Sequence, residues 1–129
     1  MKKLILFLIL TFTILDVHAK WVLVGTNEDA DIYVKTDSIK RIGHMVTYWE
    51  TFEYKSAQKV DEKEYYSLKM KNETNCNTEE SKTLFIAVYS ESMGSGKVID
   101  TWKTDKEVFR VIIPDSLAHT VFQFVCRKK

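Results

Sequence analysis

The densest group of potentially reactive side chains in this sequence is Asp115, Ser116 and His119. A serine, a histidine and a carboxylate form a hydrolytic triad when the imidazole activates the hydroxyl and a buried carboxylate holds the imidazole. Three near neighbours on one exposed helical turn rarely provide that arrangement together with an oxyanion pocket. We therefore predict a non-enzymatic protein in which His119 is a surface residue.

A glycine-rich stretch, Gly94-Ser95-Gly96-Lys97, is the second candidate, because it resembles part of a phosphate-binding loop. Glu91 stands where the GxxxxGK[ST] motif requires its first glycine, and Val98 stands where a hydroxyl should bind magnesium. The stretch is therefore expected to form a hairpin turn.

Acidic residues gather at positions 61–64 and 79–80 and could act as calcium ligands or acid/base pairs. They are interleaved with lysines and lack the alternating carboxylates of a calcium loop, so we expect solvated loops. Asn72-Glu73-Thr74 matches the N-glycosylation pattern, which is short enough to arise by chance. The sequence predicts no cofactor and no metal site.

The two cysteines, Cys76 and Cys126, are predicted to form a disulfide if the chain is exported, because exported thiols meet an oxidising environment. A redox pair and a metal site are the alternatives. The cysteines are 50 positions apart and lack CxxC spacing, and only His44 and His119 could add nitrogen ligands outside the leader.

Export is indicated by residues 1–19, which have the pattern of a secretory signal peptide. Lys2 and Lys3 precede an apolar stretch that is too short to span a bilayer as a helix, and we place the cleavage between Ala19 and Lys20. A lipid anchor needs a cysteine at the cleavage point, so the mature chain is expected to be unanchored, in the periplasm or secreted. Residues 20–129 are expected to form a single domain.

The composition fits such a domain and disfavours some partners. Hydrophobic residues make up 45% of the chain and only one proline is present, which argues against disorder and low complexity. Removing Lys2, Lys3 and Asp16 from the 19 basic and 18 acidic residues leaves equal numbers of each. Nucleic acid and anionic membranes are therefore not expected as partners.

Apolar alternation predicts a mostly antiparallel sheet of about six strands. The expected strands are residues 21–25, 31–35, 45–54, 64–71, 83–90 and 97–102. Residues 108–113 form either a last strand or an extended lead into Pro114. A tight helical turn is expected at 37–41 and polar loops at 55–63 and 72–81. The hydrophobic stretch 83–90 is expected to be buried on both faces.

The last predicted element differs from the strands in the spacing of its apolar residues. Apolar residues recur at helical spacing within 115–127, so one stripe of a helix could pack on the sheet, with Asp115 or Ser116 as its N-cap. The predicted fold is thus α+β, a single antiparallel sheet with a C-terminal helix packed on one face and tied by the Cys76–Cys126 disulfide.

A set of ordered features resembles the surface-adhesin protein E family of Gram-negative bacteria. These features are a Trp-led first strand, Asp37-Ser38-Ile39-Lys40-Arg41-Ile42-Gly43, Val46 to Trp49, Cys76, a glycine-bearing hairpin, Ile113 to Ser116 and Val125-Cys126. The resemblance covers nearly the whole mature chain. It implies binding to host matrix or plasma proteins such as laminin, vitronectin or plasminogen, sometimes as a dimer.

Our first hypothesis is therefore an exported, non-enzymatic protein that binds a protein partner, with host matrix or plasma proteins as candidates and a homodimer as one assembly. The second is a periplasmic small-ligand carrier or envelope stress protein, which would need an apolar pocket between sheet and helix. The third is an enzyme, which would need a wet cleft with convergent titratable groups. No binding residues are predicted.

Overall fold

The computed structural model describes residues 20–104 and 108–127; the expected signal peptide lies outside the described residues. The elements are β1 (Trp21–Thr26), β2 (Ala30–Lys35), the 3-10 turn η1 (Thr36–Ser38), β3 (Lys40–Ile42), β4 (Met45–Val60), β5 (Lys63–Asn75), β6 (Glu80–Tyr89), the 3-10 turn η2 (Ser92–Gly94), β7 (Val98–Lys103), β8 (Arg110–Val111) and α1 (Leu117–Val125). Within the described residues, no helix has the length and apolarity needed to span a bilayer.

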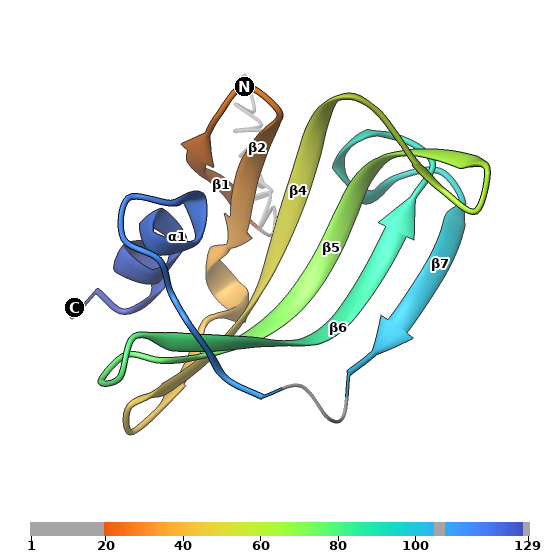
Figure 1. Cartoon of the computed structure of the whole chain (residues 1–129). Helices are drawn as coiled ribbons and strands as arrows, with labels where there is room; N and C mark the ends of the chain where they lie inside the picture. Colours follow the sequence, from red (N-terminus) through yellow and green to blue (C-terminus); the bar gives the residue numbers. More distant parts are fainter. Residues whose placement is uncertain (1–19, 105–107, 128–129) are drawn as a thin grey trace, which may run out of the picture.

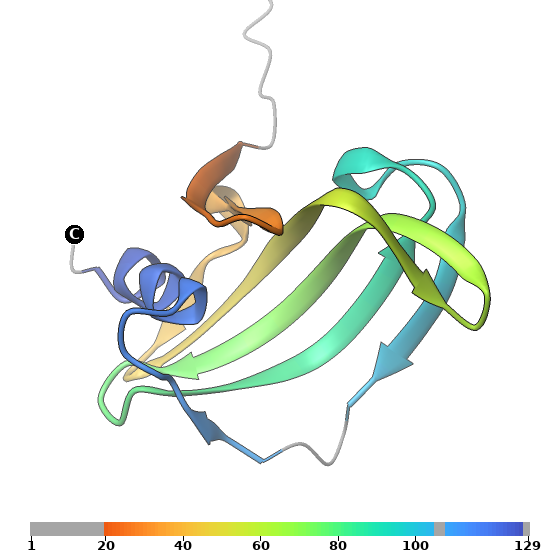
Figure 2. The same ribbon diagram turned by 45° about the horizontal axis from the view of Figure 1, so that its top comes forward.

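One antiparallel sheet contains all the strands (Figure 1). Its main order is β1-β2-β4-β5-β6-β7, with β3 beside β4 and β8 beside β6. Figure 2 shows that the sheet is strongly curved and that α1 lies beside the β1–β2 hairpin at one end. The prediction of a mostly antiparallel α+β fold with a C-terminal helix and a disulfide is confirmed.

The central strands are longer than predicted, because two expected loops are largely strand. β4 continues to Val60 and β5 begins at Lys63, so most of 55–63 forms a projecting hairpin. Its turn is Asp61-Glu62, and both residues have positive φ, as a tight hairpin turn requires. The hairpin projects beyond the sheet, so its polar side chains stay solvated while the backbone pairs. The prediction of a loop at 55–63, which was based on the polar sequence, was therefore wrong for most of these residues.

The second expected loop, 72–81, is also mostly strand. β5 runs to Asn75 and β6 begins at Glu80, which leaves only a four-residue connection that contains Cys76. Asn75 stabilises this turn, because its Oδ1 accepts hydrogen bonds from the backbone N–H groups of Asn77 and Thr78. The turn brings Cys76 to the end of the sheet nearest the C-terminus of α1.

Other boundaries differ modestly from expectation. Residues 83–90 are mostly half-buried, and only Ala87 and Val88 are fully buried, because α1 covers a different part of the sheet. The expected turn at 37–41 is a 3-10 turn at Thr36–Ser38 followed by strand β3. Residues 108–113 contain only the short β8; the remainder is the extended lead that the sequence also allowed.

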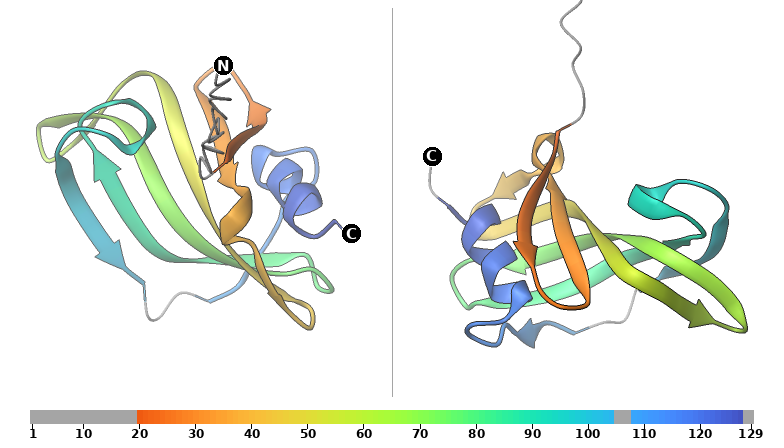
Figure 3. Two further views of the ribbon diagram at one scale, coloured as in Figure 1. Left: turned by 180° about the vertical axis from the view of Figure 1, so that it is seen from behind. Right: turned by 90° about the horizontal axis from the view of Figure 1, so that it is seen from above.

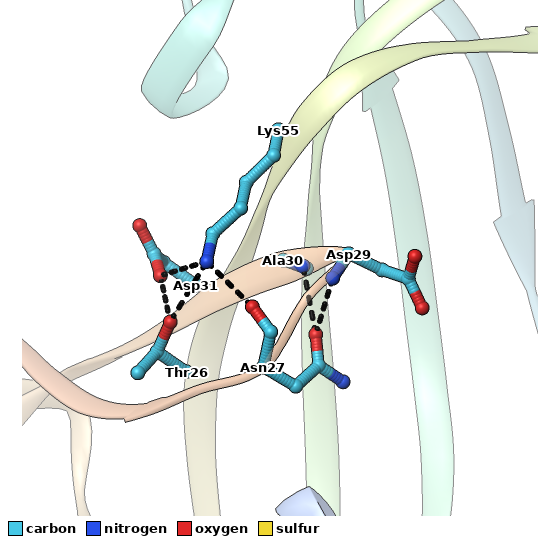
Figure 4. A network of polar contacts seen from close by, with 6 residues as sticks. All are labelled: Thr26, Asn27, Asp29, Ala30, Asp31 and Lys55. Atoms are coloured by element: carbon cyan, nitrogen blue, oxygen red, sulfur yellow. Dashed lines mark hydrogen bonds and ion pairs between the residues drawn. The ribbon is translucent and has the colours of Figure 1, made fainter.

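The β1–β2 turn is held by a polar network that reaches β4 (Figure 4). Asn27 Oδ1 accepts hydrogen bonds from the N–H groups of Asp29 and Ala30, each at 2.8 Å. Lys55 Nζ donates to the carbonyl oxygen of Asn27 and lies 3.8 Å from a carboxylate oxygen of Asp31. An exposed lysine of β4 thus ties the first hairpin to the centre of the sheet.

The main core lies between α1 and one face of the sheet. Its fully buried members come from three elements, namely Ile32 and Val34 of β2, Val46 and Tyr48 of β4, and Val121 and Val125 of α1. Figure 3 shows α1 against the β1–β2 hairpin in two further views. Gly25 permits this approach, since a Cβ there would lie 3.1 Å from the side chain of Leu117.

The start of α1 is fixed by Ser116, one of the two predicted caps. Its Oγ accepts a hydrogen bond from His119 N at 3.1 Å and donates one to the carbonyl oxygen of Ile113 at 2.6 Å. The serine therefore satisfies a helix N–H and anchors the preceding extended segment to the helix.

Replacing this cap is expected to cost stability. S116A removes both hydrogen bonds and should lower the free energy of unfolding by about 1 kcal/mol. Urea denaturation followed by circular dichroism measures the change. S56A is a matched control, because Ser56 is exposed in the projecting hairpin and should tolerate the same substitution. Equal stability of the two variants would contradict the capping role.

Candidate functional site

A cavity of about 510 Å³ lies between the α1-facing surface of the sheet and the extended segment that leads into α1. We call this segment, residues 108–113, the strap. In Figures 1 and 2 the strap runs along the end of the sheet and leads into α1. Ile112 points inward and is buried, and its N–H donates to the carbonyl oxygen of Glu79 at 2.9 Å. The strap therefore forms one wall of the cavity and is fastened to the β5–β6 turn.

The floor of the cavity carries a buried carboxylate. Glu50 is only 6% exposed, and its Oε1 accepts a hydrogen bond from Asn72 Nδ2 at 2.5 Å. The alternation of β4 places Glu50 on the same face as Val46, Tyr48 and Phe52. An acidic residue within that otherwise apolar face was the signal in the sequence, and it was not recognised as a candidate site.

The surroundings of Glu50 alter its protonation. Burial raises the pKa of the Glu50 carboxyl to about 7, and the hydrogen bond from Asn72 only partly offsets this. Burial, reinforced by the nearby Glu50 charge, also raises the pKa of the Tyr48 hydroxyl above its usual value. Glu50 can therefore gain or lose a proton close to neutral pH, whereas Tyr48 remains neutral.

A line of hydroxyl groups continues from Tyr48 across the floor. The Tyr48 hydroxyl lies 3.4 Å from Thr74 Oγ1, which lies 2.9 Å from Ser81 Oγ. Ser81 Oγ in turn donates to the carbonyl oxygen of Glu73. These contacts join hydroxyl groups of three neighbouring strands and fix the polar side of the cavity.

The predicted disulfide forms at the opposite end of α1. The sulfur atoms of Cys76 and Cys126 are bonded, and their Cα atoms lie 5.6 Å apart. Cys126 is the C-cap of α1, and the N–H of Cys76 donates to the carbonyl oxygen of His44 at 2.8 Å. The helix that roofs the core is thus tied covalently to the β5–β6 turn.

The residues that suggested a triad have structural partners instead. Ser116 caps α1, and His119 Nδ1 accepts a hydrogen bond from the backbone N–H of Asp115. The imidazole stacks on the ring of Phe122, with ring centroids 6.0 Å apart. The three residues lie close together, but their contacts are those of the first turn of the helix.

The glycine-rich stretch forms the β6–β7 connection, as predicted. It folds back onto the sheet, where Gly94 N donates to Ser67 Oγ and Met93 N donates to Glu53 Oε2. Gly94 and Gly96 both have positive φ, which glycine adopts without strain.

The acidic candidates and the residue of the glycosylation pattern differ in burial. Residues 61–64 are exposed around the β4–β5 turn, whereas Glu79 ends the β5–β6 turn and Glu80 begins β6. Asn72, expected in a loop, is instead buried in β5 and bonded to Glu50. A glycan on Asn72 would not fit the folded chain, because the side chain lies inside the protein.

The exposed aliphatic residues of the strap define what we call its outer side. Val108, Val111 and Ile113 are 72%, 73% and 71% exposed, while Ile112 between the last two is buried. Large aliphatic side chains this exposed on one short segment are typical of a surface that binds a partner.

Comparison with known proteins gives one family and one fold. The family model described as surface-adhesin protein E matches residues 21–127. Solved structures of Haemophilus influenzae protein E are similar in fold at 17% identity; one has a TM-score of 0.63 and covers 86% of each chain. A second crystal form has a TM-score of 0.64, covering 86% of this chain and 90% of that one.

A further structure, from non-typeable Haemophilus influenzae, has a TM-score of 0.60 and covers 87% of this chain and 78% of that one. No curated protein matches the sequence. At this identity the solved structures establish the likeness of fold, and the family model establishes kinship across nearly the entire described chain. The chain therefore belongs to the surface-adhesin protein E family.

Proposed function

We propose that this protein is exported and acts without catalysis by binding a host extracellular-matrix or plasma protein. The observation that carries the proposal is the match of the adhesin family model to residues 21–127. The balanced charge of the mature chain fits a partner that is held by apolar contact rather than by long-range electrostatic attraction.

We place the contact surface on the outer side of the strap. Val108, Val111 and Ile113 supply exposed aliphatic side chains, and the fastening of Ile112 to Glu79 holds the segment in place. A fixed apolar segment loses little conformational entropy when it binds, which favours affinity. Arg110, which is exposed in the same segment, supplies a polar group at the rim of this surface.

The binding surface can be tested with a paired substitution. V111D/I113D places two charges on the outer side of the strap and should weaken binding by about tenfold or more. Biolayer interferometry against immobilised laminin, vitronectin and plasminogen measures the affinity. The melting temperature should barely change, because both side chains are exposed.

L23D/V98D is the matched control, since Leu23 and Val98 are exposed aliphatic residues on other strands. It should bind like the wild-type protein. Saturable binding to none of the three proteins would contradict the proposed partner class. Equal loss in both double variants would contradict the placement on the strap.

Export is a separate part of the proposal. We propose that residues 1–19 are removed between Ala19 and Lys20, and that the mature chain leaves the cytoplasm without a lipid anchor. Cell fractionation with intact-mass analysis should find a chain that begins at Lys20 outside the cytoplasm. A cytoplasmic chain of full mass would contradict export. Light scattering of the exported protein would determine whether it forms a homodimer.

A further inference from the structure

We propose that the cavity beneath the strap binds a small organic cation, a primary amine carried on a compact apolar group, with the Glu50 carboxylate as its counter-ion. Val111 and Ile113 of the strap also line this cavity, but its floor lies on the sheet at Glu50, and the proposal does not depend on adhesion. It also provides the kind of pocket that a small-ligand carrier would need.

The floor offers one unused acceptor. Glu50 Oε1 is bonded to Asn72, whereas Oε2 has no hydrogen bond or ion pair with any described residue and keeps some exposure, since Thr51 Oγ1 is the only fully enclosed side-chain polar atom without a partner among the described residues. A buried carboxylate that lacks a charged partner is costly, because it has lost much of its hydration. An ammonium group at Oε2 would supply both the missing hydrogen bond and the opposite charge.

The remaining walls suit an apolar body attached to that ammonium. Phe52 and Met70 line the sheet side, and Ile112 and Val121 line the strap and helix sides. Methionine adapts to ligands of different shape because its side chain is flexible and polarisable. The cavity volume of about 510 Å³ lies within the range of roughly 300 to 1,000 Å³ that small-molecule sites occupy.

The charges around the cavity favour a cation at its floor. Besides Glu50, the charged residues that line the cavity are Lys82 of β6 and Arg110 of β8; Tyr48 on the same strand as Glu50 is neutral, and the lining residues of α1 and β5 are uncharged. Lys82 Nζ is engaged elsewhere, 3.7 Å from Glu73 and 4.7 Å from the centre of the Phe109 ring. Arg110 is exposed at the edge. The deepest charge is therefore negative.

Protonation of Glu50 makes the site pH-dependent. With a carboxyl pKa of about 7, roughly nine-tenths of the molecules carry the carboxylate at pH 8 and roughly one-tenth at pH 6. A primary amine stays protonated throughout this interval. Affinity for an amine should therefore be about tenfold weaker at pH 6 than at pH 8.

Benzylamine is a suitable probe, and benzyl alcohol is its neutral counterpart. Protein produced from the full-length coding sequence is titrated with each, and the side-chain amide resonances of Asn72 are followed by NMR. Benzylamine should bind saturably and at least tenfold more tightly than benzyl alcohol at pH 8. E50Q, which keeps an acceptor for Asn72, should lose at least tenfold in affinity for benzylamine, whereas E64Q in the exposed hairpin should not.

Three results would overturn the proposal: no saturation by millimolar benzylamine, equal affinity for benzyl alcohol, or unchanged binding by E50Q. Tighter binding of benzoate than of benzylamine would also overturn it, because the edge cations Lys82 and Arg110 would then select the ligand. None of these measurements involves a host protein, so their outcome is independent of adhesion.

Discussion

Breaking the Cys76–Cys126 disulfide should lower the free energy of unfolding by about 4 kcal/mol. The bond closes a loop of some fifty residues, and the chain-entropy model gives this magnitude for a loop of that length. Without the bond, α1 is a nine-residue helix that would be marginal on its own in water. Only its packing on the sheet and the Ser116 cap would then hold it.

The double variant C76A/C126A makes the comparison under one buffer condition. Urea denaturation should show the loss, and hydrogen exchange should be fastest in residues 117–125 because the helix opens first. Wild-type protein treated with reductant is the control and should lose a similar amount. A difference below about 1 kcal/mol would contradict a stabilising role for the bond.

The second large effect concerns Glu50 and pH. The pKa of its carboxyl is about 7 in the folded protein, compared with 4.5 in the unfolded chain. The unfolded chain therefore binds fewer protons between these values, and the free energy of unfolding must fall as pH rises through this interval. Below pH 4.5 the carboxyl is protonated in both states, so the cost of burying a carboxylate is absent. Above pH 7 the carboxyl is ionised in both states, and this cost is complete. The gap between the two pKa values corresponds to about 3 kcal/mol.

E50Q should remove this dependence, because an amide does not ionise. The variant is expected to be more stable than wild type by about 3 kcal/mol at pH 8 and about as stable at pH 4.5. Denaturant titrations at several pH values measure both quantities. E64Q, which alters an exposed carboxylate, should follow the wild-type pH profile. A constant difference between E50Q and wild type at all pH values would show that the carboxyl does not titrate as described.

The architecture could be predicted because local patterns determined it. The alternation of 45–54 indicated a strand, and the helical spacing near the C-terminus indicated the helix itself. The compartment implied by residues 1–19 led to the disulfide. Each of these inferences used neighbouring residues or a simple chemical rule, so no knowledge of the tertiary structure was needed.

The remaining features depend on contacts that the sequence does not display. Residues 55–60 and 72–75 are polar, and their strand conformation comes from pairing with neighbouring strands rather than from their own composition. Glu50 lies in a cavity that the strap helps to line, and the strap, residues 108–113, has only two residues in a strand. Asn72 was assigned to a loop, so its bond to Glu50 could not be foreseen.

The most direct test of the buried carboxylate on the cavity floor is a ¹³C NMR titration of the Glu50 side-chain carboxyl in the oxidised protein. The structure predicts a pKa of about 7, with reciprocal changes in the side-chain amide of Asn72. A midpoint close to 4.5 would mean that water reaches this carboxylate freely, and it would contradict both the buried floor and the amine site built on it.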